Sequence, residues 1–298
     1  MWIQALSVQK LRSMNFKKLT ILPILFLFSF HLLLAQGPWA QGKGNGYGQV
    51  VFNIIPTYSS IFDGSGGSRE SEREISEIVL SSYVELGITN NLTLGATIPF
   101  NISSTGAVTS ITETPNLPAG NLSSLGNVSL FGKYTIGNGP LKVALIPKVD
   151  LPTSTRSDVT GLSSGVDAYT FRPAISIGKS GTQAFYYGYF GYGLRSNEHN
   201  DFLSFGIEGG LKLSEKFTFI VNVDRLQNID NGNPLVDSLA NIETGLHTSF
   251  QEYTAFLLKF FVDDVVNDFG FFFSLGGGSN ANSVASSPAL SVGVFRKW

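Results

Sequence analysis

The chain has 298 residues, a formal net charge of −2 and only 14% charged residues. Soluble domains usually carry about 25% charged residues, so this composition indicates a surface that largely avoids water. A near-neutral charge without a basic patch excludes a typical nucleic-acid-binding protein. The absence of cysteine excludes a disulfide framework and a cysteine-ligated zinc site. We therefore expect no nucleic-acid partner, and no other pattern indicates a cofactor or a metal.

The start of the chain has the pattern of an export signal. Lys17 and Lys18 precede an apolar run from Leu19 to Leu34, and the small residue Ala35 follows. A positive start, an apolar middle and a small residue at the end are typical of a cleaved secretory signal peptide. The apolar run is short for a membrane-spanning helix, which needs about 20 residues. The pattern predicts a signal peptide over residues 1–35.

The stretch Ile75–Phe100 shows the pattern that the rest of the chain repeats. Two alternating segments flank Thr89–Asn91, whose asparagines favour a turn. Alternation with period two places successive side chains on opposite faces of a sheet. One face of this hairpin is apolar, and the other is small, polar or charged. The apolar face carries Ile78, Leu80, Val84, Leu86 and Ile88, followed by Leu92, Leu94, Ala96, Ile98 and Phe100.

Ten further segments of similar length read as strands. Long polar stretches follow the odd-numbered strands, and short turns such as Gly137–Gly139 follow the even-numbered ones. In chain order the other strands are predicted at Tyr47–Tyr58, Leu125–Ile136, Leu141–Leu151, Val166–Gly178, Thr182–Arg195, Asp201–Leu213, Phe217–Leu226, Phe250–Val262, Phe269–Gly276 and Pro288–Trp298. The polar connections are predicted at Asp63–Glu72, Asn101–Ser124, Thr153–Gly165, Ser196–Asn200, Gln227–Thr248 and Gly277–Ser287.

These features predict an all-β protein, a transmembrane antiparallel up-and-down β-barrel of about twelve strands. Segments of about ten residues with period two, short turns at one end and longer loops at the other are the signature of outer-membrane barrels. A secreted soluble β-sandwich, whose strands also alternate, is the alternative fold. We expect the barrel to span residues 47–298, after a short periplasmic lead over residues 36–46 that is too small for a plug domain. Met14 is a candidate true start of the chain.

The last residues resemble the C-terminal signal of outer-membrane proteins. Ser291, Gly293 and the terminal Trp298 match its polar, glycine and aromatic positions, whereas Arg296 stands where a hydrophobic residue is usual. The resemblance implies a location in the cell outer membrane, with outer-membrane lipid as a partner.

Several short motifs resemble a family of outer-membrane channels that includes the MetA-pathway-of-phenol-degradation proteins. The motifs are structural, so the resemblance implies a barrel and suggests transport, without naming a solute or a catalytic residue. They are Val84–Thr89, Leu92–Leu94, Ile98–Phe100, Leu125–Val128 and Val149–Thr153, with a Gly/Lys-containing lead at Trp39–Gly48.

If the apolar faces meet lipid, the opposite faces line a lumen. Charged side chains in a lumen set ion selectivity in a pore. The alternative is a network of ion pairs that fills a narrow barrel, because twelve strands lie between packed and open barrels. Both signs occur in similar number, which predicts weak ion selectivity. The candidates for lining the lumen are Glu85, Lys133, Lys148, Asp150, Arg172, Glu208, Lys212 and Asp224.

His247 and Ser249 give the single candidate for catalysis. They lie two residues apart, so in a strand they would share a face. A similar pair occurs in outer-membrane lipid hydrolases, in which histidine activates the serine hydroxyl. The rest of those enzymes' motifs is not recognisable here, and we expect a protein that is not an enzyme.

Three functions follow from these observations. The first is a passive channel or transporter for small solutes, hydrophobic ones among them, formed by a monomeric porin-like barrel in the outer membrane. The second is a non-conducting structural or adhesion barrel whose loops bind a partner. The third is an outer-membrane lipid hydrolase that uses His247 and Ser249.

Overall fold

The computed structural model describes residues 37–108, 116–137, 139–266 and 268–298, so the predicted signal peptide and Met14 lie outside the described residues. Apart from one short helix, the regular elements are strands. They are β1 (Gly46–Asp63), β2 (Ser68–Gly87), β3 (Leu92–Thr105), β4 (Gly120–Leu125), β5 (Val128–Ile136), β6 (Leu141–Leu151), β7 (Thr170–Ser180), β8 (Ala184–Arg195), β9 (Phe202–Lys212), β10 (Phe217–Asn228), α1 (Leu239–Ile242), β11 (Glu252–Val266), β12 (Phe269–Ala285) and β13 (Ala289–Lys297).

The strands close into a barrel. Neighbours in sequence pair antiparallel, β1 pairs with both β2 and β13, and the pairing of β2 with β3 closes the ring. β4 and β5 lie end to end beside β3, because β4 pairs with its second half and β5 with its first. The thirteen strands of the described residues therefore occupy twelve positions in the wall. The predicted fold is confirmed.

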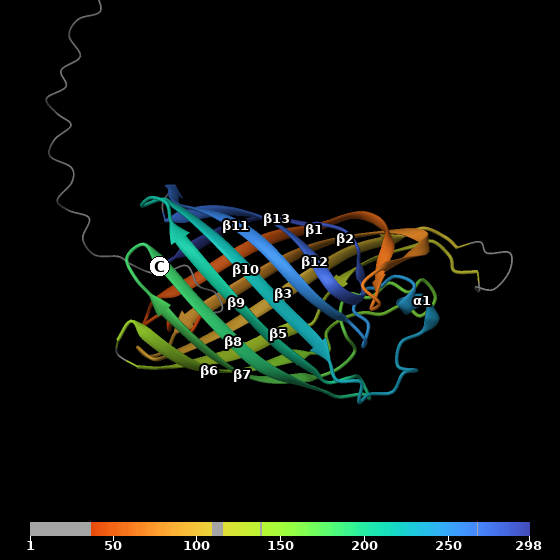
Figure 1. Cartoon of the computed structure of the whole chain (residues 1–298), viewed down its shortest axis with the longest axis horizontal. Coiled ribbons are helices and arrows are strands. Elements are labelled where there is room, and N and C mark those ends of the chain that lie inside the picture. The colour runs from red at the N-terminus through yellow and green to blue at the C-terminus, as the bar shows by residue number, and fades with distance from the viewer. Residues whose placement is uncertain (1–36, 109–115, 138, 267) are drawn as a thin grey trace, which may run out of the picture. The chain divides into compact units, whose positions relative to one another are not determined.

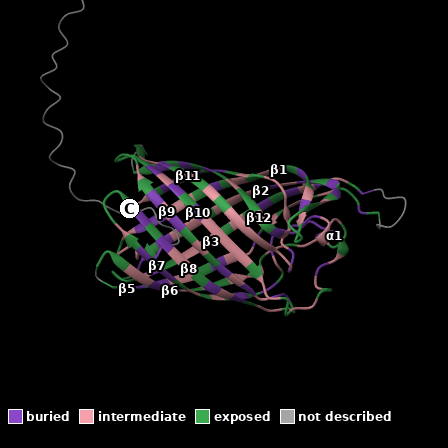
Figure 2. Cartoon of the chain, in the orientation of Figure 1, coloured by how far each residue is buried: buried purple, intermediate pink, exposed green. Residues whose placement is uncertain are grey.

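The outer face of the wall is apolar. In β3, Leu94 and Ile98 are each 48% exposed, whereas Thr93 on the opposite face is fully buried. The same alternation of exposed and buried residues runs along the other strands (Figure 2). A closed barrel satisfies every backbone group without an exposed edge, so a wall of this kind can lie in lipid. Among the described residues, no helix is long and apolar enough to cross a membrane.

The two ends of the barrel differ (Figure 1). The short-turn end holds the C-terminus and the connections β2–β3, β5–β6, β7–β8, β9–β10 and β11–β12. The loop end holds α1, the β6–β7 loop (residues 152–169) and the β10–β11 loop (residues 229–251). Long loops on one side and short turns on the other are typical of outer-membrane barrels.

Four strands reach at least five residues further into the loop end than the sequence predicts. β1 continues to Asp63 instead of Tyr58, and β3 continues to Thr105 instead of Phe100. β2 begins at Ser68 instead of Ile75, and β12 continues to Ala285, through most of the stretch that we expected to be a loop. The extension of β12 pairs with β11 at Asn282 and with β1 at Ala285. Backbone pairing with two neighbours therefore holds a Gly-, Ser- and Asn-rich segment of low strand propensity in place.

Aromatic rings lie flat on the inner wall over glycines of the neighbouring strand. A Cβ built on Gly95 would lie 2.2 Å from the Cζ of Phe131, its cross-strand partner. Such cross-strand contacts are the unit of sheet stabilisation, and the missing side chain makes room for the ring. The other pairs of this kind are Gly193 with Phe202, Gly210 with Phe185, Gly270 with Phe295 and Gly293 with Phe272.

Gly95→Ala is therefore expected to destabilise the barrel, because the new methyl group must displace the Phe131 ring. Overpacking of this kind typically costs about 1–3 kcal/mol. Urea unfolding of the refolded protein in lipid vesicles, followed by gel mobility, would measure the change. Gly277→Ala in β12 is the matched control, since its Cβ would have no neighbour within 4 Å. Equal stability of the two variants would contradict this account of the pairs.

Candidate functional site

The eight charged residues proposed for the lumen all lie on strands, on the face opposite to the exposed apolar side chains. Glu85 and Lys133 are fully buried, and Glu208 is 6% exposed. The structure brings two pairs of them together, Glu85 with Lys133 and Lys148 with Asp150. Of the other four, Glu208 binds Lys259, and Asp224 accepts a hydrogen bond from Tyr189.

The Glu85–Lys133 pair lies near the short-turn end. The Lys133 ammonium is 2.7 Å from the Glu85 carboxylate, and both side chains are at most 1% exposed. Tyr83 and Gln41 also donate hydrogen bonds to this carboxylate. Several donors around one carboxylate are what a buried charge requires, because burial without partners costs several kcal/mol. This cluster fixes β2, β5 and the chain before β1 to one another.

Residues 37–45, which we call the lead, lie inside this end of the barrel. Gln41 N donates to the Thr93 hydroxyl, and the Thr135 hydroxyl donates to Pro38 O at 2.7 Å. Trp39 packs on Phe185 of β8. Because β8 is the sixth strand from β1 in both directions around the twelve positions, the lead crosses the full width of the barrel. It is short, as the sequence indicates, but it contacts opposite walls.

Positive charge gathers on the inner wall where β6, β7 and β8 approach the loop end. Lys148 stands directly opposite Arg172 in the β6–β7 ladder, and its ammonium is 3.1 Å from Asp150. In the next row, Asp150 pairs with Thr170, and Thr170 pairs with Arg195. Like charges directly opposite each other destabilise a sheet, so this arrangement is more easily explained by function than by stability.

Lys259 and Arg195 are among the inward-facing charges that were not predicted from the sequence. Lys259 binds Glu208 at 2.8 Å, and Arg195 donates to the carbonyl of Asn200 and lies over the Phe202 ring. β11 and β8 carry these residues, and the two strands alternate poorly in sequence. A signal for Lys259 was present in the sequence, because it is the single charged residue in an otherwise apolar segment. It faces the same way as Leu257 and Phe261.

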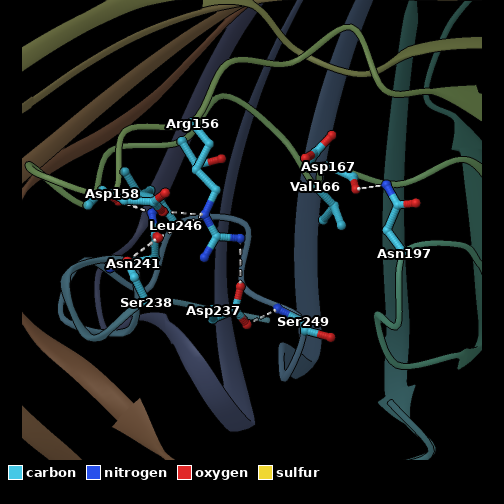
Figure 3. A network of polar contacts seen from close by, with 12 residues as sticks. Arg156, Asp158, Val166, Asp167, Asn197, Asp237, Ser238, Asn241, Leu246 and Ser249 are labelled. Carbon is cyan, nitrogen blue, oxygen red and sulfur yellow. Dashed lines mark hydrogen bonds and ion pairs between the residues drawn. The ribbon is translucent and has the colours of Figure 1, made fainter. Parts of the chain in front are cut away.

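A polar network joins two loops at the loop end (Figure 3). Arg156 on the β6–β7 loop donates to Asp237 at 3.0 Å and to Asn241 at 2.8 Å, both on the β10–β11 loop. Asp237 also accepts from the backbone N–H of Ser249 at 2.6 Å. Its side chain is fully buried, so Arg156 is the cation that compensates a buried charge.

The β10–β11 loop also reaches the wall across the barrel. The Tyr58 hydroxyl donates to Thr244 O, and Arg69 of β2 binds Glu243 at 2.9 Å. A small apolar core beneath this contact joins β1, β2 and both loops through Tyr58, Ile61, Ile75, Leu162 and Leu246. Burial lowers the pKa of His199 on the β8–β9 loop, which keeps its imidazole neutral beside this network.

His247 and Ser249 point to different partners. The His247 imidazole lies 3.2 Å from Glu77 and 3.3 Å from Asn101, whereas the Ser249 hydroxyl accepts from Asn200 N. Both residues belong to the β10–β11 loop, and His247 has a positive φ of 53°, so the strand in which they would share a face is not formed. A general base must be within hydrogen-bond reach of the proton that it takes. In this structure the two side chains therefore bind separate partners, and they do not form the arrangement that a catalytic dyad requires.

No family model and no curated protein matches the chain. Among solved structures, the COG4313 outer membrane channel from Pseudomonas putida F1 is 14% identical, with a TM-score of 0.62 over 87% of this chain and 97% of that one. The CymD monoaromatic hydrocarbon channel and the KdgM porin are 11% and 7% identical, each with a TM-score of 0.45, over 87% and 83% of this chain and 90% and 98% of theirs. The likeness to the COG4313 channel shows that the two chains share a barrel fold.

Proposed function

We propose that the protein is a passive channel of the outer membrane that admits small solutes, hydrophobic ones among them. The observation that carries this proposal is the inner wall, which is polar, charged and aromatic, while the outer wall is apolar. Fixed charges on the inner face are what a water-filled path uses to select solutes. Short segments of the chain, the lead and the two long loops, close the ends.

We extend the proposal to the surroundings, the oligomeric state and the family of the protein. Outer-membrane lipid is the surrounding partner, since the exposed band on the wall is apolar, and a monomer suffices because one chain closes the ring. Membership of the channel family that includes the MetA-pathway-of-phenol-degradation proteins is proposed from the short motifs alone. We also propose that the protein is not an enzyme, because His247 and Ser249 bind other partners.

Single-channel conductance of the refolded protein in a planar bilayer tests the channel. Discrete and reproducible current steps are expected. Silence from protein that is folded by gel mobility, and that stays silent when the lead is deleted, would overturn the proposal. That outcome would favour the second candidate, a structural or adhesion barrel, for which the packed loop network of Arg156 and Asp237 is the supporting observation.

The charges on β6–β8 predict a modest preference for anions, since Lys148, Arg172 and Arg195 outnumber Asp150. Arg172→Gln is expected to reduce that preference. Removing a unit charge about 8 Å from a permeating ion changes its energy by about 0.5 kcal/mol in water, a roughly twofold change in the permeability ratio. The reversal potential in a salt gradient measures it. Lys179→Gln, on the exposed face of β7, is the matched control. Equal shifts of the reversal potential in both variants would contradict the placement of Arg172 in the lumen.

A further inference from the structure

Trp39 lies where a solute that passes through the lumen would meet the wall of β7 and β8. Its ring centroid is 6.3 Å from that of Phe185 and 5.9 Å from that of Tyr187, with interplanar angles of 79° and 85°. Phe185 and Tyr187 are two residues apart on one strand, so they share its inner face. Edge-to-face contacts of this kind are favourable for aromatic pairs. The indole therefore makes edge-to-face contacts with both the Phe185 ring and the Tyr187 ring.

Gly178 has no side chain and so leaves room for the indole of Trp39 against the wall. It pairs with Tyr187 across β7 and β8, and a Cβ built on it would lie 3.0 Å from the Trp39 ring. Any larger residue here would collide with the Cβ of Tyr187, 2.5 Å from that position, and would also crowd the indole. Phe185 is itself held against Gly210 of β9, and both Phe185 and Tyr187 are less than 5% exposed. The slot formed by Gly178, Phe185 and Tyr187 is thus part of the rigid wall.

The slot contacts the ring of Trp39 but makes no hydrogen bond with its indole nitrogen. The indole Nε1 is buried and has no hydrogen-bond acceptor among the described residues. An unpaired buried N–H costs free energy, so an apolar ring of similar size would fit the slot at least as well. What the slot recognises is a flat aromatic shape.

The rest of the lead is held by a few bonds that do not depend on the slot. Gly44 N donates to Gly87 O and Gly87 N to Asn45 O, next to the start of β1. Lys133 donates to Trp39 O over a long 3.4 Å. The Thr135 hydroxyl donates to Pro38 O, and Gln41 N donates to the Thr93 hydroxyl, so the backbone on both sides of Trp39 is also held. The slot is therefore emptied by rotation of the Trp39 side chain while the flanking backbone stays attached.

We propose that Gly178, Phe185 and Tyr187 form a binding slot for one small planar aromatic molecule, which Trp39 fills as an internal ligand and which the molecule takes by displacing Trp39. This inference rests on the proposed function, since the ligand must reach the lumen. It deepens that function by naming planar aromatic compounds as a solute class.

Trp39 fluorescence tests the proposal. The chain has three tryptophans, so Trp2→Phe with Trp298→Phe leaves Trp39 alone. Benzyl alcohol, which does not absorb where tryptophan is selectively excited, is the probe. Its addition should shift the Trp39 emission to longer wavelength in a saturable way, because the indole moves into water. Cyclohexylmethanol, which is similar in size but not planar, should cause no saturable shift. An equal response to both alcohols, or a response to neither, would overturn the proposal.

Trp39→Ala gives a second measurement that leaves the barrel wall intact. If Trp39 fills the slot nine-tenths of the time, its removal should tighten benzyl alcohol binding about tenfold in calorimetry. Unchanged affinity would show that the two do not compete and would overturn the proposal. Conductance separates this outcome from failure of the channel itself. Current steps without competition would refute the slot and leave the channel, whereas competition without current would refute the channel and leave the slot.

Discussion

Arg156→Ala is expected to open the loop end of the barrel and to raise the conductance. Arg156 is the cation that binds Asp237, and the Asp237 side chain is fully buried. Removing one partner of a buried ion pair leaves an uncompensated charge, at a typical cost of about 3–5 kcal/mol. The β10–β11 loop can relieve this cost by moving Asp237 into water. Such a movement separates it from the β6–β7 loop.

Conductance and limited proteolysis would measure this effect together. The variant should show larger current steps and faster cleavage within residues 229–251. Arg69→Ala is the matched control, because Arg69 also binds the β10–β11 loop, at Glu243, but is 33% exposed. Because solvent reaches a third of Arg69, it can replace part of the lost contact, so this variant should lie closer to wild type than Arg156→Ala. Arg156→Met combined with Asp237→Leu leaves no unpaired charge and should keep the loops closed. Wild-type behaviour of Arg156→Ala would show that the network does not hold the loops.

The wall of the barrel was predictable because its signal is local. Apolar residues at every second position, as at Leu94, Ala96 and Ile98, specify the lipid-facing side whatever the neighbouring strands are. The outer part of β2 was missed, although it also alternates. Arg69, Ser71 and Arg73 face inward there, and the intervening glutamates are exposed. The period is two, but no apolar residue marks it, since this part of the strand meets water and loops instead of lipid.

The sequence predicted which residues face the lumen, but it did not predict which of them contact one another. Alternation assigns Glu85 and Lys133 to the inner face, but it cannot show that they bind each other, 48 residues apart in the chain. The contacts that close the barrel are further apart, such as Thr135 with Pro38 at 97 residues and Tyr58 with Thr244 at 186. Loops and a Gly-rich lead have no period that specifies a partner. Their positions follow from the diameter and the closure of the wall.

Lys133→Met and Glu85→Gln are expected to be strongly destabilising one at a time and much less so together. The pair is at most 1% exposed, so either single variant leaves one buried charge without its partner. The typical cost of about 3–5 kcal/mol should appear in urea unfolding from lipid vesicles. In the double variant no charge is unpaired, and Gln41 and Tyr83 still have a polar partner at position 85.

The coupling between the two positions is the quantity that decides this prediction. A double-mutant cycle gives it as the difference between the double variant and the sum of the singles, and contacting residues typically show about 0.5–3 kcal/mol. We expect a value at the upper end, since the pair is fully desolvated. Lys148→Met with Asp150→Asn is the matched cycle, because that pair is about one-fifth exposed and solvent can replace the missing partner. Additive effects at Glu85 and Lys133 would mean that each charge is compensated separately, Lys133 by the Trp39 carbonyl and Glu85 by Gln41 and Tyr83, so that the lead would hold the cluster together.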